Sequence, residues 1–295
     1  MSISRRPLGL TLIATFLIAA GPGRAQEAVV VPPAAMVLEN VPPVAAGLAS
    51  QVAKYNEFRP TSYASWHPTK LEMIVSRRHQ NTPQLFRVSK PGAAPTLMTD
   101  YAEPVRTAQY EPRHGRFYVF GRDSGGNEVF RAYRRDLKSA DAIPVTPDNR
   151  RVQDTAWARK SGRLLYVTVP VGRQGPNDEV ESTVSIVDPL QPELARVLAE
   201  LPGGGWGSFE FSQDEKQLVY SEYVSANESY LWLMDVASGK SRRLTGKGEE
   251  KVAYGRAVFT RDGKGLYTTS DRGSEFQRLV HIDPVSYTHL RAHET

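Results

Sequence analysis

Five aromatic residues recur along this chain at nearly constant intervals, and each belongs to the same kind of sequence block. The successive intervals are 44, 47, 54 and 48 residues. In each block one strand ends at the aromatic residue, a turn rich in Asp, Gly, Lys and Pro follows, and a second strand of β-branched and aromatic residues comes next. A period of about 40 to 50 residues built from short strands predicts a β-propeller with one blade per repeat. The aromatic anchors are Trp66, Tyr110, Trp157, Phe211 and Phe259.

Each repeat contains enough strand-forming sequence for a four-stranded blade. Turns such as Asp262-Gly263 supply the positive φ values that a tight hairpin requires. A third strand follows in most repeats, and a short fourth element such as Arg243-Leu244-Thr245 closes four of them. The alternative is an ordinary β-sandwich, but regular spacing and a shared turn position favour the propeller. We predict an all-β fold of about five blades, the last incomplete, near residues 61–100, 105–147, 152–200, 206–246 and 253–284.

The first 25 residues have the pattern of a secretory signal peptide. Arg5 and Arg6 give a positive start, and residues 8–20 form an apolar core that is short for a membrane span. Small residues at positions 23 and 25 predict cleavage before Gln26. The general export route is favoured over the twin-arginine route, and an uncleaved anchor is the alternative. We expect a periplasmic or extracellular protein that begins with a Pro-rich extended segment and a short helix at residues 26–60.

Composition excludes several kinds of function. The chain has no cysteine, which rules out disulfide and thiolate chemistry. The net charge of +5 falls to +2 when the three arginines of residues 1–25 are removed. Because no basic stripe remains, we expect no nucleic-acid partner, and no membrane association after signal cleavage.

The last eleven residues, 285–295, are unlike the rest of the chain. They resemble one translated frame of a transposase end sequence used to prepare sequencing libraries. We therefore expect a non-native tail, with the native gene interrupted near Asp283 and the fourth strand of the fifth repeat missing. The alternative is a genuine strand and tail. His289, His293 and Glu294 have the spacing of metal ligands, but the origin of the tail gives them no role.

Several short motifs resemble, in their order along the chain, bacterial exported peptidases of the prolyl oligopeptidase family. One further loop, Ser270-Asp271-Arg272-Gly273-Ser274-Glu275-Phe276, is similar to a loop of TolB-type propellers. The likeness covers about residues 40–283. The motifs that carry it are Ala64-Ser65-Trp66-His67-Pro68, Gln84-Leu85-Phe86-Arg87-Val88, Glu103-Pro104-Val105 and Asp123-Ser124-Gly125-Gly126-Asn127-Glu128.

This resemblance implies a propeller that precedes an α/β-hydrolase domain and limits access to short peptides. The Ser-Asp-His triad of such peptidases lies in the hydrolase domain, with its serine in a Gly-x-Ser-x-Gly turn. The present chain contains no Gly-x-Ser-x-Gly sequence. We therefore assign no catalytic residue, and we expect neither a cofactor nor a metal ion.

We interpret the other candidate residues as parts of turns and loops and not as reactive groups. Gly239-Lys240-Ser241 indicates a hairpin turn and not a phosphate loop, and residues 203–207 indicate a flexible link between blades. Glu249-Glu250 resembles the acidic pair with which dipeptidyl peptidases hold a substrate amino group, although its neighbours favour a solvated loop. The histidines at 67, 79, 114 and 281 are dispersed. Loop residues that we place at the central channel or against the missing domain are Arg77, Arg78, Arg122, Asp123, Asp271 and Arg272.

Three functional hypotheses follow. The first is the N-terminal part of an exported serine peptidase, inactive by itself, with the missing hydrolase domain and short peptides as its partners. The second is a TolB-like propeller that binds a protein partner. The third, an enzyme with its site in the central channel, lacks support because no set of Asp, Glu, Asn or His recurs in each blade. An unclosed ring of blades would leave apolar faces without partners, so we expect poor solubility.

Overall fold

The computed structural model describes residues 28–172, 179–246 and 250–284, together with the backbone of residues 289–291. The predicted signal peptide of residues 1–25 lies outside these ranges. The chain divides into two compact units, Met1–Arg59 and Pro60–Thr295. In the described part of the chain, no helix is long and apolar enough to cross a membrane.

The first unit is a chain reversal followed by one helix. Val29 forms an isolated antiparallel bridge with Ala45, and the N–H of Val30 donates to the carbonyl of Val44 at 2.9 Å. Helix α1 (Ala46–Asn56) begins directly after this reversal and buries none of its residues. The Pro-rich segment thus folds back on itself, whereas the sequence predicts an extended chain.

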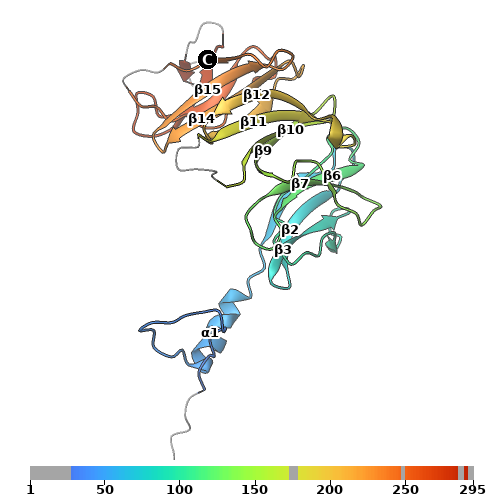
Figure 1. The fold of residues 1–295 in the computed structure, drawn as a ribbon, viewed down its shortest axis with the longest axis vertical. Helices are drawn as coiled ribbons and strands as arrows, with labels where there is room; N and C mark the ends of the chain where they lie inside the picture. The colour runs from blue at the N-terminus through green and yellow to red at the C-terminus, as the bar shows by residue number, and fades with distance from the viewer. Residues whose placement is uncertain (1–27, 173–178, 247–249, 285–288, 292–295) are drawn as a thin grey trace, which may run out of the picture. The chain divides into compact units, whose positions relative to one another are not determined.

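The second unit consists of five four-stranded antiparallel sheets, each built from strands that are consecutive in sequence. The sheets follow one another along an arc (Figure 1), so the predicted all-β fold of four-stranded blades is confirmed. We call the first strand of each sheet its inner strand; β1 contacts β5, and β9 contacts β13. The strands are β1 (Thr61–Trp66), β2 (Met73–His79), β3 (Thr82–Val88), β4 (Thr96–Leu97), β5 (Ala108–Tyr110), β6 (Phe117–Arg122), β7 (Arg131–Asp136), β8 (Ile143–Pro144), β9 (Arg150–Ala158), β10 (Arg163–Pro170), β11 (Glu181–Val187), β12 (Arg196–Pro202), β13 (Trp206–Phe211), β14 (Gln217–Ser225), β15 (Glu228–Asp235), β16 (Ser241–Arg243), β17 (Val258–Phe259), β18 (Leu266–Ser270), β19 (Arg278–Ile282) and β20 (His289–Arg291), with a 3-10 turn η1 (Pro192–Leu194) before β12.

Side chains hold the turn that follows each inner strand. In the fourth sheet, the Ser212 hydroxyl donates to Asp214 at 2.7 Å and accepts the N–H of Gln217 at 3.0 Å. Thr260 and Asp262 repeat this arrangement in the fifth sheet, with a hydroxyl-to-carboxylate distance of 2.6 Å. These bonds replace water at backbone groups that the hairpin leaves unpaired. The repeated sequence block therefore encodes a repeated turn.

A buried threonine completes the backbone pairing at the outer edge of three sheets. The N–H of Leu85 donates to the Thr99 hydroxyl at 2.9 Å. The first, second and fourth sheets share this arrangement, because in each the threonine follows the short fourth strand. The corresponding pairs are Ala132 with Thr146 at 3.1 Å and Leu231 with Thr245 at 3.0 Å.

Apolar side chains fill the space between neighbouring sheets. Ile74 and Leu85 of the first sheet pack with Tyr118 and Phe120 of the second. Complete burial of one such side chain contributes about 1.5–3 kcal/mol relative to exposure. The other inter-sheet clusters include Phe117, Leu164 and Tyr166 between the second and third sheets, Leu165, Val184, Trp206 and Phe209 between the third and fourth, and Val219, Leu231, Leu266 and Ile282 between the fourth and fifth.

The opposite face of the first sheet carries an apolar row. Tyr63 pairs with Val75, Val75 with Phe86, and Phe86 with Leu97. Directly paired residues share a face, and neighbouring residues along a strand alternate faces, so this row lies opposite Ile74 and Leu85. Tyr63 is 60% exposed and Leu97 is 37% exposed. The face has the composition of a sheet interface.

The fifth sheet corrects one expectation from the sequence. Its fourth strand is present: β20 pairs antiparallel with β19, with His281 opposite Leu290. The prediction that the fifth sheet lacks a fourth strand is therefore wrong, whereas the non-native origin of residues 285–295 stays a prediction. Strand pairing uses backbone groups that every residue except proline provides, so an open edge accepts an extended segment whatever its origin.

Candidate functional site

The second unit contains a cavity of about 1060 Å³ that is lined mainly by its inner strands. The lining includes residues from β1, β5, β9 and β13, and thus from four of the five sheets. Each inner strand is an edge strand of its sheet, so the cavity lies where a propeller has its central channel. Exposed aromatic surface is present here, because Trp66 and Phe130 both line the cavity and are 54% and 42% exposed.

Six charged side chains line this cavity, four of them arginines. Glu210 and Arg256 form an ion pair at 2.6 Å that links the fourth sheet to the segment before β17. The guanidinium of Arg131 donates to the carbonyl of Thr146 at 3.1 Å. The remaining three are Arg106, Asp154 and Arg159.

Asp154 joins the inner strands of the third and fourth sheets. Its carboxylate accepts the N–H of Thr155 at 2.8 Å and the N–H of Phe209 at 3.2 Å. Ser208 has a φ of +57°, and the pairing of β13 with β14 is irregular between Gly207 and Glu210. This bulge turns backbone N–H groups toward Asp154. Burial raises the pKa of Asp154, and the backbone hydrogen bonds oppose that effect.

A second ionic cluster lies between the first and second sheets. Glu72 is buried, accepts the Tyr110 hydroxyl at 2.8 Å, and accepts the Arg87 guanidinium at 2.6 Å. Burial alone would raise the pKa of Glu72, but the hydrogen bonds from Arg87 and Tyr110 outweigh it and the pKa is lowered. The neighbouring His67 is buried, and that burial lowers its pKa. The cluster links the two sheets, and its members His67 and Tyr110, although buried, belong to the cavity lining.

The predicted channel residues lie elsewhere and have structural contacts. Arg122 lies 3.7 Å from Glu103 and covers the ring of Tyr101, with 4.4 Å between the guanidinium carbon and the ring centroid. Asp123 is buried and accepts the N–H of Glu128 at 3.0 Å. Asp271 accepts the N–H of Ala253 at 2.8 Å. None of Arg77, Arg78, Arg122, Asp123, Asp271 and Arg272 lines the cavity.

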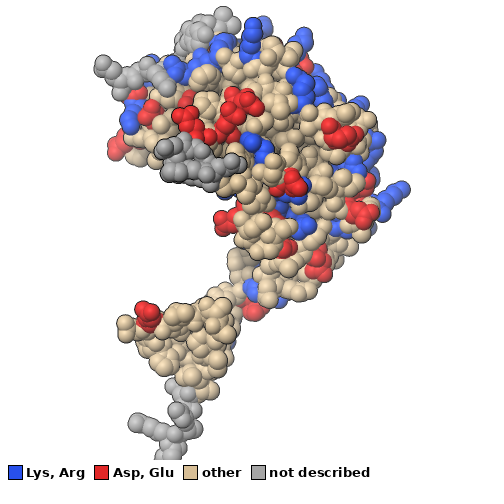
Figure 2. Space-filling model, in the orientation of Figure 1, with Lys and Arg blue, Asp and Glu red and all other residues tan. Residues whose placement is uncertain are grey.

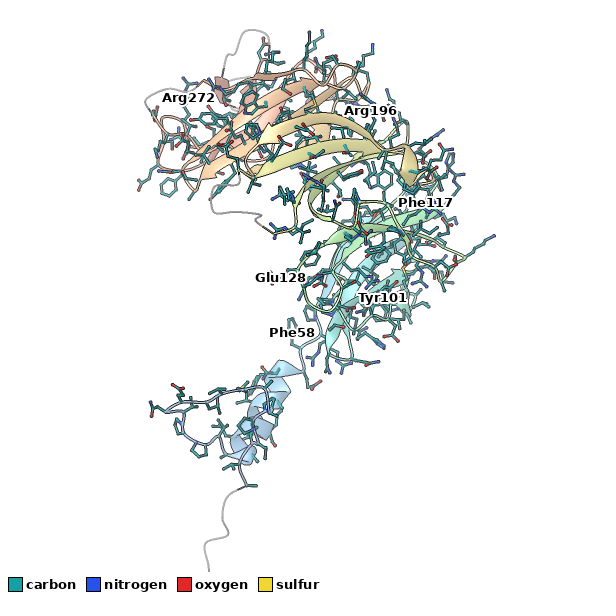
Figure 3. All side chains as sticks on the ribbon, viewed as in Figure 1. Phe58, Tyr101, Phe117, Glu128, Arg196 and Arg272 are labelled. Carbon is teal, nitrogen blue, oxygen red and sulfur yellow. The ribbon has the colours of Figure 1, made fainter. Side chains whose placement is uncertain are left out.

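Figure 3 places the predicted loops on different sheets. The labelled side chains Glu128 and Arg272 belong to the second and fifth sheets, respectively, and they lie far apart in this view. From the sequence we grouped the predicted channel residues as charged residues of loops, but Arg77 and Arg78 lie in β2 and Arg122 is the last residue of β6. In the structure they do not converge on one site.

The other sequence candidates do not form a reactive centre. His79 lies 3.7 Å from Asp100, and His281 stacks edge-on against Tyr267 with 5.3 Å between the ring centroids. Gly239 has a φ of +70° and its N–H donates to Asp235, which is a hairpin turn. Among the described residues, no three His, Asp or Glu side chains lie close enough to hold a metal ion. Glu249, His293, Glu294 and the side chain of His289 lie outside the described residues.

Sequence reasoning missed the charged lining of the cavity. Arg106 precedes β5 and Arg159 follows β9, so each looks like an ordinary loop arginine in the sequence. Asp154 gives a stronger signal, because it lies in the strand that ends near the aromatic anchor Trp157, and a buried acid in a strand requires hydrogen-bond partners. Lysines and arginines are interspersed with acids over the visible face of the second unit (Figure 2). The distribution of charged residues along the sequence therefore does not predict the position of the cavity.

Comparison with solved structures supports the propeller fold. A manganese complex of oligogalacturonate lyase has a TM-score of 0.63 and 12% identity, and the match covers 79% of this chain and 66% of the lyase. For prolyl oligopeptidase B from Galerina marginata the TM-score is 0.60 and the identity 16%, with 80% of this chain and 38% of the oligopeptidase covered. A putative TolB from Agrobacterium tumefaciens has a TM-score of 0.53 and 12% identity, with 79% and 80% covered.

These comparisons show a shared fold and not a shared activity. The solved neighbours include propeller domains of prolyl oligopeptidase-family peptidases, oligogalacturonate lyase and TolB. The chain spans about two thirds of the lyase and less than two fifths of the oligopeptidase. No protein-family model matches the chain, and no curated protein sequence matches it.

Proposed function

We propose that this chain is the propeller part of an exported serine peptidase of the prolyl oligopeptidase type. In the complete protein the propeller admits short peptides to a separate α/β-hydrolase domain, where an acyl-enzyme forms on a serine. One observation carries the proposal: the match to prolyl oligopeptidase B covers 80% of this chain but only 38% of that protein. The order of the motifs at residues 64–68, 84–88 and 123–128 supports the same family.

Under this proposal the chain itself contributes gating and docking. The cavity of about 1060 Å³ has room for a short peptide, and its wall combines exposed aromatic surface with charged groups. A route through the propeller excludes folded proteins because their width exceeds that of an extended peptide. Bond cleavage requires the serine, histidine and acid of the second domain.

The test is a comparison of this chain with the complete gene product. We expect the complete protein to hydrolyse short chromogenic peptides, and the 295-residue chain to show no catalysed hydrolysis. Replacing the serine of the Gly-x-Ser-x-Gly turn by alanine in the complete protein should abolish the activity. Peptide turnover by the present chain alone would contradict the proposal.

A TolB-like binding protein is the second candidate. The match to the putative TolB covers 79% of this chain and 80% of that protein, so this alternative needs no additional domain. Under this alternative we expect the complete gene product to bind a protein partner and to hydrolyse no peptide. An intact protein that captures a protein partner, and that lacks a nucleophilic serine, would favour it.

For both candidates we propose export to the periplasm or the exterior, on the basis of residues 1–25. A reporter that is active only after export, fused after residue 60, tests this point. Activity that depends on Arg5 and Arg6 and on the apolar core of residues 8–20 is the expected result. An active reporter after removal of these residues would contradict it.

A further inference from the structure

We propose that the cavity formed by the inner strands selects peptides that carry acidic side chains. This inference rests on the proposed function, because it names the substrate class that the propeller would admit. It follows from the balance of charge on the cavity wall.

The two carboxylates of the wall are already engaged. Asp154 accepts backbone N–H groups of Thr155 and Phe209. Glu210 holds Arg256 at 2.6 Å. Neither acid therefore offers a free carboxylate to a cationic ligand, and either would have to give up a present partner to bind one.

Two guanidinium groups of the wall have no such partner. Arg106 and Arg159 are exposed, and within the described residues neither takes part in an ion pair or a side-chain hydrogen bond. A guanidinium presents several N–H donors in a plane that matches a carboxylate, which makes arginine the preferred partner of that group. The wall therefore offers two uncompensated sites for anionic groups.

The neighbouring surface suits the rest of a peptide. Trp66 and Phe130 expose apolar area in the same cavity, which can pack against side chains next to a bound carboxylate. The inner strands are sheet edges, so an extended peptide lies beside backbone groups of the same kind. These features favour an acidic peptide over a small inorganic anion.

Fluorescence anisotropy with three labelled hexapeptides tests the inference on the 295-residue chain. The peptides differ only in carrying Glu, Gln or Lys at the same positions. We expect the Glu peptide to bind most tightly and its advantage to shrink in high salt. Arg106→Gln and Arg159→Gln should each weaken its binding roughly two- to five-fold. Arg261→Gln removes the same charge from an exposed hairpin turn of the fifth sheet, and should have no effect.

The outcomes separate this inference from the proposed function. Equal affinity for the three peptides, or an equal effect of Arg261→Gln, would overturn the acidic preference and leave peptide docking intact. No binding of any peptide would count against both. Binding of an oligogalacturonide in place of the Glu peptide would assign the site to sugar acids and overturn the peptide assignment.

The same variants can also be assayed in the complete protein, so that the test does not depend on the solubility of this chain. There we expect a higher kcat/KM for the Glu peptide than for the Gln peptide, and loss of that difference in the Arg106→Gln, Arg159→Gln double variant. A difference that survives in the double variant would place the selectivity outside this cavity.

Discussion

At the residue scale, Glu72 is the most constrained charged group between the first two sheets. It lies directly before β2, where it is 2% exposed, and its two oxygens face Tyr110 and Arg87 at 2.8 and 2.6 Å. A buried carboxylate with one missing partner is costly, whereas a fully paired one is tolerated. The cluster therefore fixes how the first sheet meets the second.

Glu72→Gln should destabilise the protein by about 2 kcal/mol, because a hydrogen bond to a charged group is lost inside the interface. The pKa of Glu72 is lowered in the folded state, so its contribution is fully present above the unfolded pKa of about 4.3. That contribution is lost as the pH falls below this value toward the folded pKa. Urea unfolding at a series of pH values measures both effects.

The matched control is Glu193→Gln, because Glu193 is exposed on η1. This change should leave the unfolding midpoint unaltered at every pH. If Glu72→Gln unfolds like wild type and keeps the same acid dependence, then the cluster does not stabilise the interface.

At the element scale, a threonine after the fourth strand makes the same hydrogen bond in three of the sheets. Thr99, Thr146 and Thr245 each accept an N–H from the third strand of their own sheet. The fourth strands β4, β8 and β16 have only two or three residues. A side-chain hydroxyl therefore continues the ladder where the strand itself has ended.

Thr245→Val should cost about 1–3 kcal/mol, because it leaves the N–H of Leu231 buried without an acceptor. Thr245→Ser keeps the hydroxyl and should recover most of that loss. Thr96→Val in the exposed strand β4 serves as the control. Hydrogen exchange of the Leu231 amide gives the direct readout, and unchanged protection in Thr245→Val would refute the assignment.

Removal of residues 285–295 tests the unexpected strand β20. We expect faster hydrogen exchange of amides in β19 and more self-association, because the deletion opens a sheet edge. Replacing the segment by an unrelated extended sequence of equal length should restore protection, since the pairing is between backbones. Unchanged exchange in β19 after the deletion would show that β20 does not protect this edge.

Most strands and turns of the second unit could be predicted from the sequence, because they depend on residues that are close together in the chain. The Asp262-Gly263 turn and the alternating strands after each aromatic anchor depend on neighbours a few residues away. The ionic partners could not be predicted: Glu72 meets Tyr110 across 38 residues, and Arg256 meets Glu210 across 46. Strand β20 was missed for a different reason, since edge pairing ignores side-chain identity.

At the scale of the whole molecule, the first sheet has an apolar face opposite its packed one. Tyr63, Val75, Phe86 and Leu97 form a row across all four strands. The corresponding faces inside the arc are filled by the next sheet. Apolar sheet faces of this kind mark an interface or a tendency to aggregate.

Tyr63→Lys together with Leu97→Lys should raise the soluble monomer fraction of this chain, because both side chains are exposed on this face. Tyr223→Lys together with Val224→Lys, at two exposed residues of β14, adds the same charge elsewhere and should help less. Analytical ultracentrifugation after expression measures the monomer fraction. Equal behaviour of the two variants, or a wild-type chain that is already a soluble monomer with a sharp melt, would contradict this account.

The nucleotide sequence of the intact locus shows whether this propeller belongs to a longer peptidase, as we propose. The reading frame followed beyond Asp283 should continue for a few hundred codons. We expect it to encode Gly-x-Ser-x-Gly, then an aspartate and a histidine in the order of an α/β-hydrolase. A frame that stops after two or three more blades, or that naturally encodes residues 285–295 followed by a stop codon, would contradict this proposal.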